Sequence, residues 1–172
     1  MRIKILMLLG LIIVFSSCKN EKEEQTTEKI EVNNSHAVSQ QDIEKLDYIE
    51  YAIDDKVANQ IKDWTEYHQL QTVINSTKKG DLSYFNDNEK AIKTAFKELK
   101  SKIPSAVKSP SISARILVVE TKLYKLESLA NLATTSKEEL LATIKELLVA
   151  FSNLNLQMNK KVEFDSINIE KP

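Results

Sequence analysis

The chain has 172 residues, with 24 lysines and arginines against 25 aspartates and glutamates, two glycines and one cysteine. Basic and acidic residues are interspersed, which argues against a nucleic-acid interface or a patch for anionic membranes. The scarcity of glycine excludes a glycine-rich phosphate-binding loop. The composition therefore favours neither nucleotide chemistry nor nucleic-acid binding.

The first 17 residues have the pattern of an export signal. Arg2 and Lys4 supply positive charge, residues 5–14 are apolar apart from Gly10, and small residues precede Cys18. An apolar run of about ten residues is too short for the roughly 20 that a membrane-spanning helix needs. We therefore predict a signal peptide over residues 1–17 rather than a transmembrane anchor.

The segment that ends at Cys18 resembles the lipobox of bacterial lipoproteins. The resemblance implies cleavage before Cys18, a diacylglycerol on its sulfur and an acyl chain on its new amino group. An ordinary secretory signal would instead leave a free thiol at the start of the mature chain, a poor choice for an exported protein. The expected partner at this end is membrane lipid, bound through Cys18, and no other cofactor is expected.

Residues 18–41 are rich in Glu, Lys, Asn, Ser and Thr and contain few apolar side chains. Such a segment cannot bury enough surface to offset its ordering entropy, so we predict a lipidated flexible tether. Residues 19–24 resemble the acidic signal that directs lipoproteins of Bacteroidetes to the outer face of the outer membrane. A periplasm-facing position is the alternative, because a charged linker has much the same composition.

Residues 42–161 are predicted to form an antiparallel up-and-down four-helix bundle, which makes the protein all-α. Three segments repeat apolar residues at helical spacing. They are Leu82, Phe85, Ile92, Phe96, Leu99 and Ile103; then Ile112, Ile116, Val119, Leu123, Leu126, Ala130 and Ala133; then Leu140, Ile144, Leu147, Phe151, Leu154 and Met158. A first helix over residues 42–78 would carry Leu46, Ile49, Ile53, Val57, Ile61, Trp64, Tyr67, Leu70 and Ile74.

Residues that end or begin helices separate these segments. Gly80 can adopt the left-handed conformation that ends a helix, and Asp81 can cap the next one. Ser109 before Pro110 is a good start for the third helix, and Ser136 with Glu139 forms a capping box for the fourth. Short connections of this kind place consecutive helices antiparallel.

Residues that could carry catalysis or hold a metal are scarce. After Cys18 the chain contains only two histidines, His36 and His68, and no Glu-x-x-His pair of the kind that di-iron bundles use. Zinc would need about four ligands, and His68 has no second Cys or His within helical reach. We therefore expect no enzyme and no metal site.

Four residues are candidates for ligand or partner contact. Trp64, Tyr67 and His68 cluster on one side of the first helix, where they could wall a pocket or form a core edge with their polar tips in water. Arg115, the one arginine after Cys18, could bind a carboxylate ligand or pair with Glu98 or Asp55 of a neighbouring helix. A third group, Asn153, Asn155 and Gln157, could fix helix register or be a solvated flank.

The tail, residues 162–172, contains Val162, Phe164, Ile167 and Ile169. A helix over residues 42–78 would span about 55 Å, longer than the other three. We therefore expect the tail to pack on the surplus turns of that helix. The alternative is a frayed terminus, with the first helix breaking near Asp54 and Asp55 and folding back.

Short motifs resemble a group of small lipoproteins from Flavobacteria and relatives within the Bacteroidetes, whose function is not established. They are Ile103-Pro104, Ile112-Ser113-Ala114-Arg115, Val119-Glu120-Thr121 and Phe151-Ser152-Asn153-Leu154-Asn155. The resemblance supplies no catalytic residue. The sequence thus predicts a non-enzymatic helical lipoprotein of the cell envelope that contacts another envelope protein, with a small-ligand-binding or sensing bundle as the alternative.

Overall fold

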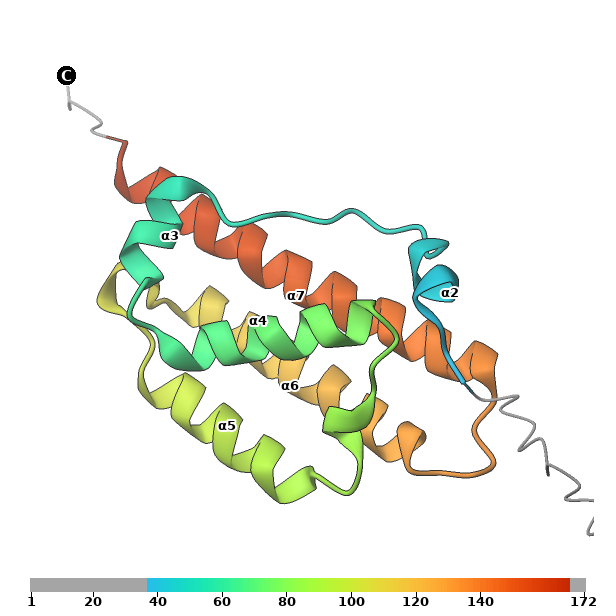
Figure 1. Cartoon of the computed structure of the whole chain (residues 1–172). Coiled ribbons are helices and arrows are strands. Elements are labelled where there is room, and N and C mark those ends of the chain that lie inside the picture. Colours follow the sequence, from blue (N-terminus) through green and yellow to red (C-terminus); the bar gives the residue numbers. More distant parts are fainter. Residues whose placement is uncertain (1–36, 168–172) are drawn as a thin grey trace, which may run out of the picture. The chain divides into compact units, whose positions relative to one another are not determined.

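The computed structural model describes residues 37–167, and every regular element of this part is helical (Figure 1). The prediction of an all-helical protein is confirmed for this part of the chain. The signal peptide, Cys18, nearly all of the tether and Ile169 lie outside the described residues.

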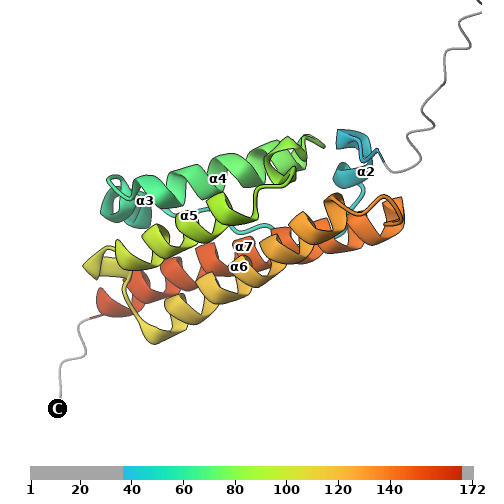
Figure 2. The same ribbon diagram turned by 90° about the horizontal axis from the view of Figure 1, so that it is seen from below.

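The two longest helices, α6 (Pro110–Ala130) and α7 (Lys137–Asp165), form the most extensive helix pair (Figure 2). Both begin at the predicted residues, although only the Ser136 half of the predicted capping box is found in the described part of the chain. The Ser109 hydroxyl accepts a hydrogen bond from the Ile112 N–H, and the Ser136 hydroxyl accepts one from the Glu139 N–H. A six-residue connection joins them, so they run antiparallel. The predicted apolar positions of α7 are all buried, and those of α6 are buried from Ile112 to Leu126.

Two further helices, α4 (Thr65–Lys78) and α5 (Glu89–Ser101), pack on this pair. The chain between them turns at Gly80, whose φ is +81°, as the sequence predicted. Asp81 does not cap α5. Its carboxylate accepts a hydrogen bond from the Ser83 N–H, at the first residue of the short 3₁₀ helix η1 (Ser83–Phe85), while Asn88 precedes α5. A second 3₁₀ helix, η2 (Ser105–Val107), links α5 to α6.

The prediction of one helix over residues 42–78 is wrong. The segment contains α2 (Gln40–Glu44), then a non-helical stretch, then α3 (Asp55–Ile61) and α4. We name the stretch of residues 46–54 the strap, because it runs along α7 from α2 to α3 (Figure 1). The alternative of a break near Asp54 and Asp55 is the one the structure supports, since Asp54 is the N-cap of α3.

The strap is extended because α7 supplies hydrogen-bond partners for its backbone. Ser152, Asn155 and Asn159 lie on one face of α7, at the three- and four-residue spacing of helix neighbours. Their side chains bond to the backbone of Ile49, Tyr51, Ala52 and Asp54. A helix would satisfy these backbone groups internally, so the side chains of α7 replace the helical bonds.

The prediction that the tail docks on a longer first helix is also wrong. Helix α7 continues through Val162 to Asp165, and Val162 packs on the core. Phe164 and Ile167 are 70% and 56% exposed. The surplus turns do not exist, because the first segment folds back as the strap and three shorter helices.

Candidate functional site

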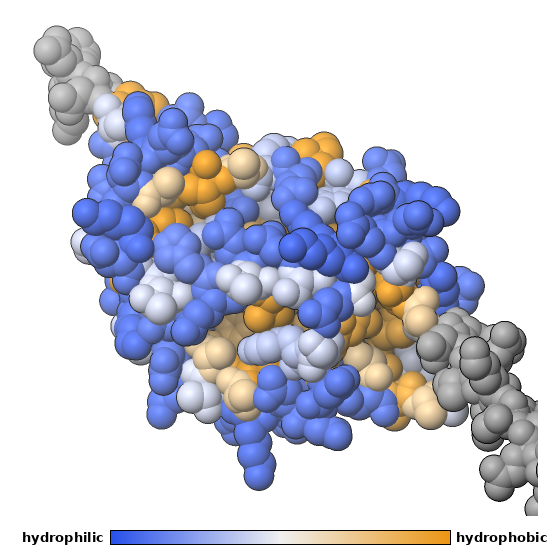
Figure 3. All heavy atoms as spheres, viewed as in Figure 1, coloured by the Kyte–Doolittle hydropathy of each residue, from blue (hydrophilic) through white to orange (hydrophobic). Residues whose placement is uncertain are grey.

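An apolar groove of about 230 Å³ lies between α4 and α5. Apolar side chains from both helices line its walls, and Leu123 of α6 forms its floor. Its lining residues are Glu66, Gln69, Leu70, Val73, Tyr84, Ala95, Phe96, Leu99 and Leu123. Figure 3 shows the hydrophobic surface between the two helices, framed by hydrophilic side chains.

The geometry of the two helices explains why this groove exists. Phe96 and Leu99 of α5 and Leu70 of α4 turn toward the core and are almost fully buried. Ala95 also lines the groove but carries only a methyl group, so the space beside α4 is not filled. The small side chain of Ala95 thus contributes to the open space between the two helices.

The rim of the groove carries one carboxylate, and its negative charge is balanced by a lysine. Glu66 on α4 forms an ion pair with Lys102 at the end of α5, and the exposed fraction of the Glu66 side chain is only 10%. The hydrogen bond from Lys102 lowers the pKa of Glu66 and raises the pKa of Lys102. Both groups are therefore charged at neutral pH and compensate each other.

Two uncharged polar side chains also border the groove. Gln69 is exposed on α4, and Tyr84 of η1 is partly buried. Burial, assisted by the nearby Tyr124, raises the pKa of Tyr84, so its phenol keeps its proton at neutral pH. Among the hydrogen bonds of the described residues, neither side chain has a partner.

The predicted aromatic cluster lies on the other side of α4, against α7, and does not line the groove. Trp64 is 2% exposed and stacks on Tyr67, with 5.5 Å between ring centroids, and Tyr67 stacks on Phe151 of α7 at 5.8 Å. The expectation that the indole and phenol tips reach water is wrong. The phenol donates to Asn155, and the Trp64 Nε1 is buried without a hydrogen-bond partner among the described residues.

His68 and Arg115 are both exposed, and of the two the His68 ring contacts the cluster, edge-on to Tyr67 with 5.6 Å between ring centroids. The Nε2 of His68 on α4 lies 3.2 Å from the carbonyl oxygen of Ile61, the last residue of α3. Arg115 forms no ion pair with Glu98 or Asp55 in the described part of the chain, and Glu98 instead pairs with Lys102. The predicted pairing of Arg115 is therefore not found.

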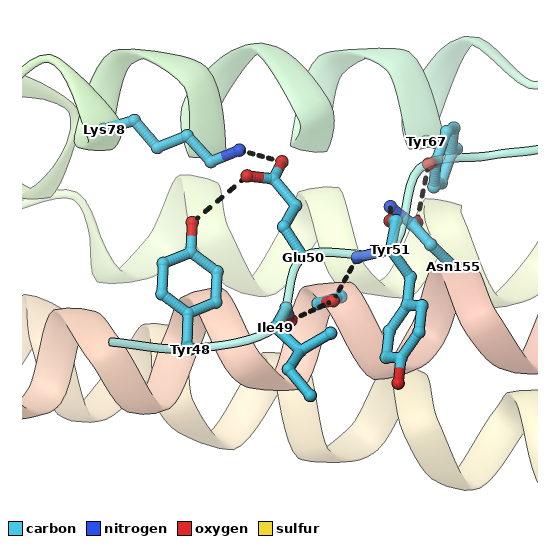
Figure 4. A network of polar contacts seen from close by, with 8 residues as sticks. Tyr48, Ile49, Glu50, Tyr51, Tyr67, Lys78 and Asn155 are labelled. Carbon is cyan, nitrogen blue, oxygen red and sulfur yellow. Dashed lines mark hydrogen bonds and ion pairs between the residues drawn. The ribbon is translucent and has the colours of Figure 1, made fainter. Parts of the chain in front are cut away.

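Polar residues of α7 bind the backbone of the strap, and one of them, Asn155, also accepts a hydrogen bond from Tyr67 of α4 (Figure 4). Ser152 Oγ donates to the Ile49 carbonyl at 2.9 Å and accepts from the Tyr51 N–H at 2.7 Å. Asn155 Nδ2 donates to the Tyr51 carbonyl at 3.0 Å. At the other side of the strap, Glu50 pairs with Lys78 of α4 and accepts from the Tyr48 hydroxyl. The sequence singled out Asn155, but neither Ser152 nor Asn159.

A second surface feature is the outer face of the first three turns of α6. The exposed residues there, apart from Arg115, are uncharged: Pro110, Ser111, Ser113, Ala114, Leu117, Val118 and Thr121. Leu117 is 57% exposed and Val118 is 40% exposed. We call the set Ser113, Ala114, Leu117, Val118 and Thr121 the α6 face. The α6 face thus exposes two aliphatic side chains and no charged one, on a chain in which 28% of residues are charged.

Metal and membrane features can be stated for the described part of the chain alone. In residues 37–167, no three His, Cys, Asp or Glu side chains come together as a metal-binding group. No helix in that part combines the length and apolarity needed to cross a bilayer.

Comparisons with protein-family models, curated proteins and solved structures gave no match to this chain. The resemblance to small lipoproteins of Flavobacteria therefore stays a prediction.

Sequence reasoning missed the residues of the groove as a site. It placed Leu70, Phe96, Leu99 and Leu123 in the core, which is correct, but it did not show that the core is open between α4 and α5. One signal in the sequence was Val73, which lies beside Ile74, a predicted core residue, and so widens the apolar surface of this helix. The hollow depends on the size of Ala95 opposite α4, which becomes visible only once the two helices are paired.

Proposed function

We propose that this protein is a lipid-anchored helical protein of the bacterial cell envelope that acts, without catalysis, by contact with another envelope protein. The α6 face supports the proposed contact with a partner protein. Its exposed Leu117 and Val118 are flanked by small uncharged residues. Small residues allow a partner backbone to approach closely, and aliphatic side chains gain free energy when they are buried.

The anchor is proposed at Cys18, with a diacylglycerol on its sulfur and an acyl chain on its amino group. The support is the signal pattern of residues 1–17 and the lipobox resemblance. Two or three acyl chains would hold the protein stably, since each buried methylene contributes about 0.8 kcal/mol. The outer membrane is the proposed location, with the periplasmic and the cell-surface side both compatible with residues 19–24.

The finer topology is part of the proposal. We infer that α4, α5, α6 and α7 make up an up-and-down four-helix bundle, to which α2, the strap and α3 are added along α7. The short connections between these helices support it, because they favour antiparallel neighbours.

The anchor is tested by replacing Cys18 with serine in cells of a lipoprotein-processing bacterium. We expect the Cys18→Ser protein to accumulate as uncleaved precursor or to leave the outer-membrane fraction, because serine has no sulfur to accept the diacylglycerol. Processing and sedimentation like those of the wild type would contradict the lipobox interpretation.

The contact role is tested by placing a photo-crosslinking amino acid at position 117 in intact cells. Position 91 on α5 is the matched control, because Ala91 is also an exposed helical residue. We expect a discrete crosslinked species from position 117 and none of the same mass from position 91. The same pattern from both positions, or none from either, would contradict a contact through the α6 face.

A second candidate function is binding of a small ligand, and the groove between α4 and α5 favours it. The groove is apolar, it is bordered by a few polar side chains, and its floor is a third helix, which is the usual composition of a ligand site. Trp64, Tyr67, His68 and Arg115 are not part of this candidate, since none of them lines the groove.

A further inference from the structure

We propose that the α4–α5 groove selects a small uncharged molecule with an apolar body of about one ring and a single polar group. This inference rests on the ligand-binding function proposed above and adds the class of ligand and the residues that select it.

The size of the groove sets the size of the ligand. Its volume is about 230 Å³ and its floor, Leu123, is 1% exposed. An apolar cavity of roughly 150 Å³ in another protein is large enough to bind benzene. The α4–α5 groove can therefore enclose one six-membered ring with a short substituent.

The lining of the groove determines the apolar part of the ligand. Leu70, Phe96 and Leu99 are each less than a tenth exposed, and with Val73 they present aliphatic and aromatic surface to the hollow. Burial of apolar ligand surface there removes it from water, which favours binding. A ring also offers its edge or face to the Phe96 side chain.

The charges of the groove argue for an uncharged ligand. Among the residues that line it, Glu66 is the only charged one, and its carboxylate is occupied by Lys102. An anionic ligand would find no free cation in the lining and would lie beside a carboxylate. A cationic ligand would have to compete with Lys102 for Glu66. Either ion would lose hydration without gaining a free counter-charge.

Gln69 and Tyr84 can receive the polar group of the ligand. The carboxamide of Gln69 both donates and accepts hydrogen bonds, and the phenol of Tyr84 can donate one. Neither side chain has a hydrogen-bond partner among the described residues, so a ligand hydroxyl or amide would replace water without breaking a bond within the protein. This favours an alcohol, phenol or primary amide over a pure hydrocarbon.

The test uses the full lipidated chain in lipid nanodiscs and three isosteric probes that differ in charge. They are 4-fluorobenzyl alcohol, 4-fluorobenzoate and 4-fluorobenzylammonium, each followed by its fluorine NMR signal. Nanodiscs without protein correct for partition of the probes into lipid. We expect the alcohol to bind at least tenfold more tightly than either ion.

Two substitutions on one helix locate the site. Ala95→Leu fills the groove, whereas Ala91→Leu adds the same atoms to an exposed position of α5 outside it. We expect Ala95→Leu to weaken binding of the alcohol at least tenfold and Ala91→Leu to leave it unchanged. Tyr84→Phe, which keeps the shape of the lining, is a further variant in case Ala95→Leu does not fold, and it should weaken binding roughly three- to tenfold.

The outcomes distinguish the class of ligand from the location of its site. Tighter binding of either ion, lost in Ala95→Leu, would overturn the uncharged class but keep a ligand site in the groove. Binding of the alcohol that is the same in wild type, Ala95→Leu and Tyr84→Phe would overturn the location. If no probe binds the protein above the lipid background, both this inference and the ligand-binding function fail.

Discussion

The phenol of Tyr67 on α4 donates a 2.8 Å hydrogen bond to the side-chain oxygen of Asn155 on α7, between two otherwise apolar surfaces. The Asn155 side chain also donates to the carbonyl oxygen of Tyr51 in the strap. One amide group thus joins α4, α7 and the strap. Asn155 is 5% exposed, so water cannot easily replace either bond.

Asn155→Ala should destabilise the protein by about 2–3 kcal/mol, because it leaves both the Tyr67 hydroxyl and the Tyr51 carbonyl without a partner in a buried place. Tyr67→Phe removes only one bond and should cost about 1–2 kcal/mol. Urea unfolding followed by circular dichroism measures both. Asn153→Ala is the control on the same helix, since Asn153 is less buried and should change stability by under about 0.5 kcal/mol.

Gly80→Ala should destabilise the protein by about 1–3 kcal/mol for two reasons. The φ of +81° is strained for an L-residue with a side chain, and a Cβ at this position would lie 2.8 Å from the carbonyl oxygen of Val38. Because that oxygen belongs to the backbone, the start of α2 would have to move. Melting temperatures compare Gly80→Ala with Lys79→Ala. Lys79 is the adjacent exposed residue, and we expect its replacement to leave the melting temperature nearly unchanged. Equal melting temperatures for the two variants would show that the turn does not need glycine.

The sequence predicted α6, α7 and the end of α4 well because their signals are local. The caps at Ser109 and Ser136 and the turn at Gly80 each depend on a few adjacent residues, and the apolar spacing of α7 shows directly which face is buried. In contrast, the strap has the apolar spacing of a helix, with Leu46, Ile49 and Ile53 at three- and four-residue steps. It is extended because Ser152, Asn155 and Asn159, about 100 positions later in the chain, bind its backbone.

The candidate site was harder to predict than the fold for a related reason. A pattern shows which residues face a core, but not whether the core is filled where two helices meet. Trp64 and Tyr67 were prominent as residue types, yet they are packing residues between α4 and α7. Ala95, which leaves the groove open, has no chemical feature that would attract attention in a sequence.

Leu147→Ala on α7 and Leu123→Ala on α6 should each destabilise the protein by about 2–5 kcal/mol, because both side chains are almost fully buried. The cost at Leu123 should be the smaller of the two, since Leu123 borders the groove and its neighbours have room to relax. Leu117→Ala is the matched control on α6, where the leucine is 57% exposed and the change should cost under about 0.5 kcal/mol. Equal unfolding free energies for the three variants would contradict the assigned core.

Stability should also fall in alkaline solution as the buried tyrosines lose their protons. Burial, with an additional contribution from Glu50, raises the pKa of Tyr48 from 10.0 to about 12, and burial raises the pKa of Tyr67 still further. A raised pKa means that the folded state favours the protonated phenol. The resulting stabilisation is complete below pH 10, where the unfolded tyrosines are protonated, and it is lost as the pH rises from 10 through 12.

Urea midpoints measured between pH 8 and pH 12 test this expectation, with tyrosinate absorbance recorded on the same samples. The midpoint of the wild type should decrease above pH 10, and Tyr48→Phe and Tyr67→Phe should each make the decrease shallower, because a phenylalanine has no proton to lose. Tyr51→Phe is the control, since the Tyr51 contacts in the strap are made by its backbone and should not depend on its hydroxyl. A decrease that is equally steep in the wild type and in the Tyr48 and Tyr67 variants would mean that other groups, such as the paired lysines, cause the alkaline loss of stability.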